Sequence, residues 1–162
     1  MESAPIELVD VRELASAAEE VVAAFERDHA ELLAHAEVHH IGATSLPAGH
    51  TKGDVDVNAR VEEARFDRLV AALGERLAVA QPENWTPTFA SFAAAGYALP
   101  LGVQVTVIGS DDDFLLALRD RLRADPVALQ RYDDAKLAAA ASGAGAYWKA
   151  KDGLLRELLT EQ

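Results

Sequence analysis

The chain has 162 residues, half of them hydrophobic, which fits one domain with a sizeable buried core. Its formal net charge of -12, from 27 acidic and 15 basic residues, makes nucleic acid an unlikely partner unless the basic groups gather on one face. Cysteine is absent, which excludes disulfides and thiol nucleophiles and suits a cytoplasmic location.

The N-terminal half is predicted to begin with a helix over residues 12–36, which are rich in Ala, Leu and Glu with apolar residues near helical spacing. A short apolar strand follows and ends at Ile41. Gly42 then allows a sharp turn, and the proline and glycines of residues 47–53 indicate a loop. The chain therefore reaches a turn and a loop directly after its first strand.

The central part of the chain alternates strands with a helix. We predict a strand over residues 54–60, a helix over residues 62–77 and a weaker strand over residues 88–93. Residues 103–108 form the clearest predicted strand, expected to pair in a hairpin and to lie centrally in the sheet. Although residues 84–110 carry no charge, polar residues, prolines and glycines interrupt them, so we expect core strands and no membrane span.

The C-terminal part is predicted to be helical. Ser110 and Asp113 resemble a capping box for a helix over residues 110–123, and the acids at 111–113 are expected to serve its positive end. The Asp-Pro pair at 125–126 begins another helical region, which continues toward the C-terminus. Together these elements predict one α/β (α+β) domain over residues 1–162, with a small mixed sheet, an N-terminal helix and C-terminal helices.

Two aspartates mark the start of the strand at 54–60. Because successive strand side chains point to opposite faces, Asp54 and Asp56 project on one side, with Val55 and Val57 on the other. Two carboxylates so placed suit one Mg²⁺ ion, which binds one or two carboxylates together with substrate phosphates. The alternative is a solvated strand edge on which both acids face water.

The turn before these acids offers groups that suit phosphate. Backbone N–H groups of Gly42 and Ala43, and the hydroxyls of Thr44 and Ser45, are candidates to hold phosphate oxygens. The alternative is an ordinary polar turn. Lys52 either contacts phosphate or balances the charge of the nearby acids.

Neutral side chains complete the candidate site. His39 and His40 are adjacent, so in a strand they face opposite ways, and His40 has either a catalytic or a structural role. Gln104 and Thr106 share a strand face expected to look toward the two aspartates, where they serve as neutral metal ligands, hold water, or form a polar patch beneath a helix.

Two Tyr-x-x-x-Lys pairs lie near the C-terminus. Residues four apart share a helix face, so each pair is placed to stack on a base and to meet phosphate, although Tyr and Lys are also common at the borders of amphipathic helices. The pairs are Tyr132 with Lys136 and Tyr147 with Lys151.

The turn followed by an Asp-x-Asp strand resembles the nucleotidyltransferase fold of the polymerase beta type, and within it the GrpB family. The family pattern reads roughly HIGSTSVPGL, then a Lys and a strand with an Asp, and this chain carries it at residues 40–47, Lys52 and Asp56. Residues 103–107 stand where the family has a His-Leu-His-Val strand, and the tail is similar through its Tyr-x-x-x-Lys pairs.

The resemblance implies a phosphate-bearing small molecule as ligand and transfer of a nucleotidyl group from a nucleoside triphosphate to a small acceptor with Mg²⁺. Three departures qualify it, because Ala43 replaces a Ser while Gln104 and Thr106 replace the histidines. The strand that usually supplies a third carboxylate contains none. Two alternatives therefore remain: a catalytically degenerate module that binds a nucleotide or phosphate ligand, and a structural protein that binds another protein.

Overall fold

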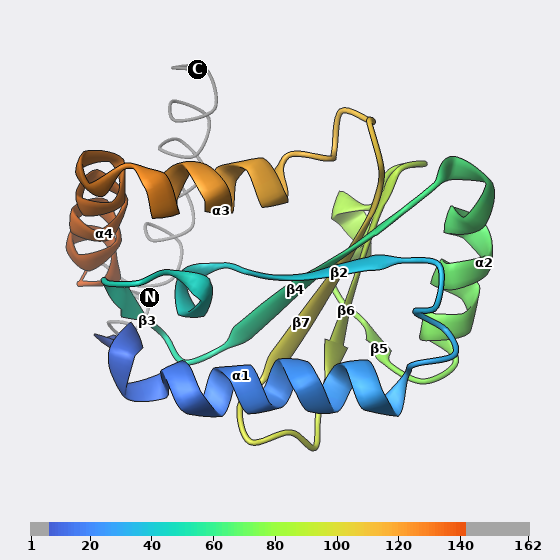
Figure 1. Ribbon diagram of the computed structural model, residues 1–162, viewed down its shortest axis with the longest axis horizontal. Helices are drawn as coiled ribbons and strands as arrows, with labels where there is room; N and C mark the ends of the chain where they lie inside the picture. Colours follow the sequence, from blue (N-terminus) through green and yellow to red (C-terminus); the bar gives the residue numbers. More distant parts are fainter. Residues whose placement is uncertain (1–6, 142–162) are drawn as a thin grey trace.

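A five-stranded mixed sheet forms the centre of the protein in the computed structural model, which describes residues 7–141 (Figure 1). Strands β4 and β7 pair in parallel at its middle, and all other neighbours are antiparallel. The predicted hairpin and the central position of its second strand are thus confirmed. In spatial order the strands are β2 (Glu37–Ile41), β4 (Val55–Val61), β7 (Leu101–Val107), β6 (Phe89–Ala94) and β5 (Ala78–Val79).

Helices cover both faces of this sheet, and the predicted α/β (α+β) class with a small mixed sheet is confirmed. Helices α1 and α2 pack on one face, whereas α3 crosses the other (Figure 1). None of the helices within residues 7–141 is both long and apolar enough to cross a membrane. The helices are α1 (Val11–Asp28), α2 (Glu63–Gly74), α3 (Leu115–Ala124) and α4 (Pro126–Ala140), with short 3₁₀ turns η1 (Ala43–Ser45) and η2 (Pro82–Asn84).

A second, two-stranded sheet lies beside α4. It pairs β1 (Val9–Asp10) with β3 (His50–Thr51) in antiparallel fashion. Helix α4 follows α3 directly, because Asp125 ends α3 and also accepts hydrogen bonds from the first N–H groups of α4. The predicted start of a helix at the Asp-Pro pair is therefore confirmed.

Strand β4 separates an apolar face from a polar one. Its valines, with Ala59, lie in the core under α1 and α2. On the opposite face, Asn58 is paired with Gln104 of β7 and Arg60 with Thr106. Because paired residues point to the same face, the sequence correctly predicted that Gln104 and Thr106 share the face of Asp56.

The first helix is shorter than predicted. It ends at Asp28, and the predicted continuation to residue 36 is wrong. The backbone of His29 leaves the helical region, and its ring lies 5.0 Å from the ring of Phe25. Turns then bring Leu33 into the core at 7 % exposure, so tertiary packing overrides the helical propensity of this Ala- and Leu-rich segment.

The predicted capping box of the third helix is also wrong, because α3 begins at Leu115. The hydroxyl of Ser110 donates to the carbonyl of Val107, and Asp113 binds Arg60 on β4. Asp112, which accepts from Thr86 and Thr88, and Asp113 therefore make long-range contacts rather than capping this helix. The predicted helical interruption at residues 142–145, and the helix after it with Tyr147 and Lys151, lie outside the described residues.

Candidate functional site

The side chain of Asp56 lies in a narrow slot between two glycines. A Cβ atom on Gly42 would lie 2.7 Å from Oδ2 of Asp56, and one on Gly102 would lie 2.7 Å from Oδ1. Gly42 also has a φ of +76°, which side chains disfavour. The backbone of the turn and the start of β7 thus approach this carboxylate as closely as two glycines allow.

Asp54 precedes β4 and lies on the same side of the fold as Asp56. Burial raises the pKa of Tyr132, and the negative charges of Asp56 and Asp54 raise it further. Both carboxylates therefore lie near the phenol of Tyr132. Lys52 forms an ion pair with Asp54 at 3.7 Å. In this structure, then, Lys52 balances an acid, which was one of its two predicted roles.

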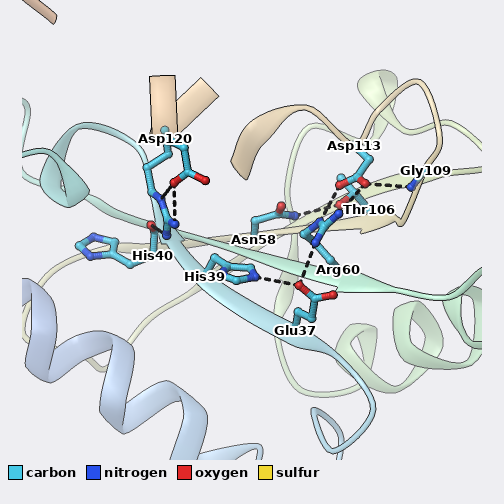
Figure 2. A network of polar contacts seen from close by, with 10 residues as sticks. Glu37, His39, His40, Asn58, Arg60, Thr106, Gly109, Asp113 and Asp120 are labelled. Carbon is cyan, nitrogen blue, oxygen red and sulfur yellow. Dashed lines mark hydrogen bonds and ion pairs between the residues drawn. The ribbon is translucent and has the colours of Figure 1, made fainter. Parts of the chain in front are cut away.

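Two buried amide oxygens share the face of Asp56. Asn58 is fully buried and donates to the backbone oxygen of Gln104 at 2.9 Å. It also donates to Oγ1 of Thr106 at 3.0 Å (Figure 2). Within residues 7–141, neither Oδ1 of Asn58 nor Oε1 of Gln104 has a hydrogen-bond partner. Because an unpaired buried oxygen is costly, these atoms are positions where a water or a cation would be stabilised.

The turn η1 uses its hydroxyls internally. Ser45 donates through Oγ to the carbonyl of Gly42 at 2.6 Å, and Oγ1 of Thr44 lies 2.9 Å from Nε2 of His40. The amides of Ala43 and Thr44 open the 3₁₀ turn, where N–H groups have no acceptor inside the helix. Phosphate contacts at this turn would therefore use amides rather than hydroxyls.

Two arginines of α3 hold the ends of the same turn. Arg119 donates to the carbonyl of His40 at 3.1 Å, and Arg123 donates twice to the carbonyl of Ser45, at 3.1 and 2.9 Å. Burial, followed by the charges of Arg123 and Arg119, lowers the pKa of His40 to about 4. The turn thus lies in positive potential, and His40 is neutral at pH 7.

His39 and His40 point apart, as predicted for neighbours in a strand (Figure 2). His39 contacts Glu37 at 3.0 Å, and Glu37 also pairs with Arg60 at 2.8 Å. Arg60 also donates two hydrogen bonds to Asp113. These bonds hold the pKa of Asp113 below its ordinary value. This network joins β2, β4 and the loop before α3, and so has a structural role.

Helix α4 places three further side chains beside the site. Tyr132 and Lys136 are buried, at 4 % and 3 % exposure, and the ammonium of Lys136 lies 4.3 Å from the centre of the Tyr132 ring. Asp133 accepts from the backbone N–H of His50 at 2.7 Å and lies 2.9 Å from Nδ1 of that histidine. Tyr132 is therefore part of the core instead of an exposed stacking surface, and His50 has a partner that the sequence did not indicate.

Comparison with known proteins identifies the family. A family model described as GrpB protein matches residues 12–161, which is most of the chain. The chain belongs to the GrpB family. A UPF0157 protein of Vibrio cholerae is 25% identical over 135 residues, which cover 83% of this chain and 72% of that protein. The crystal structure of conserved protein GrpB from Enterococcus faecalis is similar with a TM-score of 0.71 and 21% identity, covering 96% of this chain and 98% of that one.

The family model confirms the GrpB resemblance. The similar crystal structure, at 21% identity, shows a shared fold and nothing more. The structure brings together the Gly42 turn, Asp56 and Asp54. Five further residues lie around this site that the sequence analysis did not single out. Arg119 and Arg123 had a detectable signal, because residues four apart share a helix face. The remaining missed residues, Asn58, His50 and Asp133, became visible only through contacts between distant segments.

Proposed function

We propose that this GrpB-family protein binds a nucleoside triphosphate with Mg²⁺ and transfers its nucleotidyl group to a small acceptor. The observation that carries the proposal is the slot of Asp56, whose carboxylate is in close approach to the backbone of Gly42 and Gly102. A cation held by this carboxylate would lie directly beside the turn. Phosphates bound by the turn and the cation would then be neighbours, as phosphoryl chemistry requires.

The donor atoms beside the slot suit Mg²⁺. Asp54 and Asp56 provide carboxylate oxygens, and Gln104 and Asn58 provide amide oxygens that have no partner within residues 7–141. Within that range there is no group of three His, Cys, Asp or Glu residues that would favour a metal held by the protein alone. A set of hard oxygen ligands with only two carboxylates fits an ion that completes its shell with phosphate and water.

Basic groups on the other side of the turn support phosphate binding. Arg119 and Arg123 donate to carbonyls at the two ends of the turn, so the amides between them remain in positive potential. Lys52, which pairs with Asp54 at 3.7 Å, is placed to exchange this acid for a phosphate oxygen. In the reaction these residues bind and orient the triphosphate, and Mg²⁺, when bound, offsets the negative charge that develops on the departing pyrophosphate.

A second candidate function is a binding module that keeps the ligand but not the turnover. It is favoured by the missing third carboxylate, since Gln104 and Thr106 occupy the facing strand. It is also favoured by Ala43, which lacks a hydroxyl in the turn. Both functions need the same slot, and the binding module holds either a nucleotide or another phosphate ligand there. A cytoplasmic location, where nucleoside triphosphates are available, belongs to either version of the proposal.

Thermal unfolding with nucleotides tests the shared part. With MgATP, MgGTP, MgCTP or MgUTP at about 100 times its Kd, we expect a stabilisation of about 2.7 kcal/mol, seen as a higher Tm. The Asp54→Asn/Asp56→Asn double variant should lose the shift. Asp67→Asn/Asp134→Asn, which changes two exposed acids on α2 and α4, should keep it. Absence of any shift in the wild type contradicts nucleotide binding in both functions, and pyrophosphate release then separates turnover from binding.

A further inference from the structure

His50 is contacted at both its backbone and its ring by one carboxylate, that of Asp133. It lies in β3, where Asp133 accepts its backbone N–H at 2.7 Å through Oδ1 and contacts its Nδ1 at 2.9 Å through Oδ2. Asp133 itself is buried at 6 % exposure on α4. One carboxylate therefore fixes both the main chain and the ring of this histidine.

The contact also determines which ring nitrogen carries the proton. An ionised carboxylate only accepts hydrogen bonds, so Nδ1 of His50 must donate to Asp133. In the neutral ring the lone pair is then on Nε2, the arrangement by which a carboxylate prepares a histidine to accept a proton. The His50 side chain is 36 % exposed, and within residues 7–141 Nε2 has no hydrogen-bond partner, so a bound molecule can reach it.

The backbone around His50 is held equally firmly. The buried ammonium of Lys136 donates to the carbonyl of His50 at 2.8 Å. Gly49, with a φ of +109°, lets Asp133 approach, because a Cβ there would lie 3.0 Å from Oδ1. A ring held through Nδ1, on a backbone held at its N–H and its carbonyl, loses less entropy when a reaction requires it in one place.

This pair lies at the border of the proposed cation site. Tyr132, the neighbour of Asp133, has its pKa raised by burial and then by the charges of Asp56, Asp54 and Asp133. All three carboxylates therefore lie near one phenol. His50 also lies in the segment that links the turn η1 to Asp54, which keeps it on this side of the molecule.

His40, the histidine predicted from the sequence, is less suited to accept a proton. Its Nε2 is engaged with Thr44, and its pKa of about 4 makes it a weak base at neutral pH. We propose that His50, oriented by Asp133, is the general base that activates the acceptor hydroxyl in the nucleotidyl transfer. This inference rests on the proposed function and names a residue for the one role that the missing third carboxylate leaves open.

The step balances without a further reactant. Nε2 of His50 takes the proton of the acceptor hydroxyl while the oxygen of that hydroxyl forms a bond to the α-phosphorus of the nucleoside triphosphate. The bond from that phosphorus to the bridging oxygen breaks, and its electron pair leaves with pyrophosphate. The proton then passes from the imidazolium to solvent or to pyrophosphate, and water replaces the acceptor hydroxyl in slow hydrolysis.

Protection from diethyl pyrocarbonate tests where His50 lies relative to the nucleotide. The reagent acylates exposed imidazole nitrogens, and mass spectrometry reports the rate at each histidine. We expect the MgNTP that raises Tm to slow acylation of His50 at least fivefold and to leave the exposed His35 unchanged. Protection should disappear in Asp54→Asn/Asp56→Asn. A nucleotide that raises Tm without protecting His50 overturns the general base and leaves the proposed function intact, whereas no Tm shift removes both.

Rescue by a small base separates catalysis from a structural role. We expect His50→Ala to release pyrophosphate from the bound nucleotide about 100-fold more slowly, the scale of general base catalysis, with KM little changed. Added imidazole should restore much of the rate, which a loop that has only lost an anchor would not allow. His35→Ala should keep the wild-type rate. An unchanged rate in a folded His50→Ala protein, no rescue, or a wild type that binds nucleotide without any pyrophosphate release each overturns the proposal.

Discussion

The two sides of the candidate site each place a histidine in a different environment. On the side of α3, His40 lies near Arg119 and Arg123, is partly buried, and has a pKa of about 4. On the side of α4, His50 is partly exposed and bound through Nδ1 to the carboxylate of Asp133. Residue type alone therefore does not decide the role of a histidine, because burial and the contacts of the ring differ between the two sides.

The comparison also divides the work of the proposed reaction. The α3 side has guanidinium groups and backbone amides, which suit phosphate oxygens. The α4 side has carboxylates, which suit a cation and a base. The Gly42–Asp56 contact joins the two sides, since the glycine belongs to the turn and the carboxylate to the acidic group.

The largest expected effect comes from filling this contact. Gly42→Ala puts a Cβ 2.7 Å from the Asp56 carboxylate at a positive φ, so we expect a loss of about 2–4 kcal/mol in the free energy of unfolding. Urea denaturation measures it. Gly53→Ala is the matched control, because Gly53 has a φ of +105° with nothing within 4 Å. Equal losses in the two variants would show that the slot is not tight.

Removing the anchor of His50 should have the next largest effect. Asp133→Ala leaves the N–H of His50 and its ring without their acceptor, which should lower the free energy of unfolding by about 2–3 kcal/mol. Asp134→Ala, next to it but exposed, should change stability by about 0.5 kcal/mol or less. A similar loss in both variants would mean that the α4 side is not organised by Asp133.

The pKa of His40 predicts a stability loss in acid. The unfolded ring titrates near the ordinary histidine pKa of 6.5 and the folded ring at about 4, so above pH 6.5 both states are neutral and His40 contributes nothing. Between these values the unfolded state binds the extra proton. The wild type should therefore lose about 1–2 kcal/mol more than His40→Gln between pH 7 and pH 5. Parallel pH profiles of the two proteins would contradict the low pKa.

The smallest expected effect is the change in the pKa of His40 when Arg123 is replaced, which tests whether Arg123 contributes positive potential at the turn. In Arg123→Gln a positive neighbour is lost, so the pKa of His40 should rise by roughly half a unit. Histidine proton shifts in an NMR titration report it directly. Arg121→Gln, on the same helix, should leave the value unchanged. A fall in the pKa, or no change, would show that Arg123 does not lower the pKa of His40.

Much of the scaffold could be predicted because it depends on local patterns. The alternation of residues 54–60 and 103–108 correctly gave two strands with Asp56 and Gln104 on one face, and the Asp-Pro pair at 125–126 correctly gave a helix start. Helix ends were less accurate. At residues 29–36, packing of Leu33 outweighed helical propensity, and at Asp113 a long-range ion pair replaced a cap.

The site itself was predictable only where its residues are close in sequence. The turn and the two aspartates form one segment, so their motif was visible. The bond between His50 and Asp133 spans 83 positions, and nothing in the pattern of either segment indicates the other. The same holds for the carbonyls held by Arg119 and Arg123, because backbone acceptors leave no signature in the sequence.

The junction at Asp125 has a consequence for substrate choice. One residue ends the helix that carries Arg123 and starts the helix that carries Asp133, so no linker absorbs a change in their separation. A ligand that contacts both helices must match a span built into the polypeptide. Among compounds that differ only in the number of atoms between their anionic group and their hydroxyl, affinity should therefore be highest at one length and lower for shorter and longer ones.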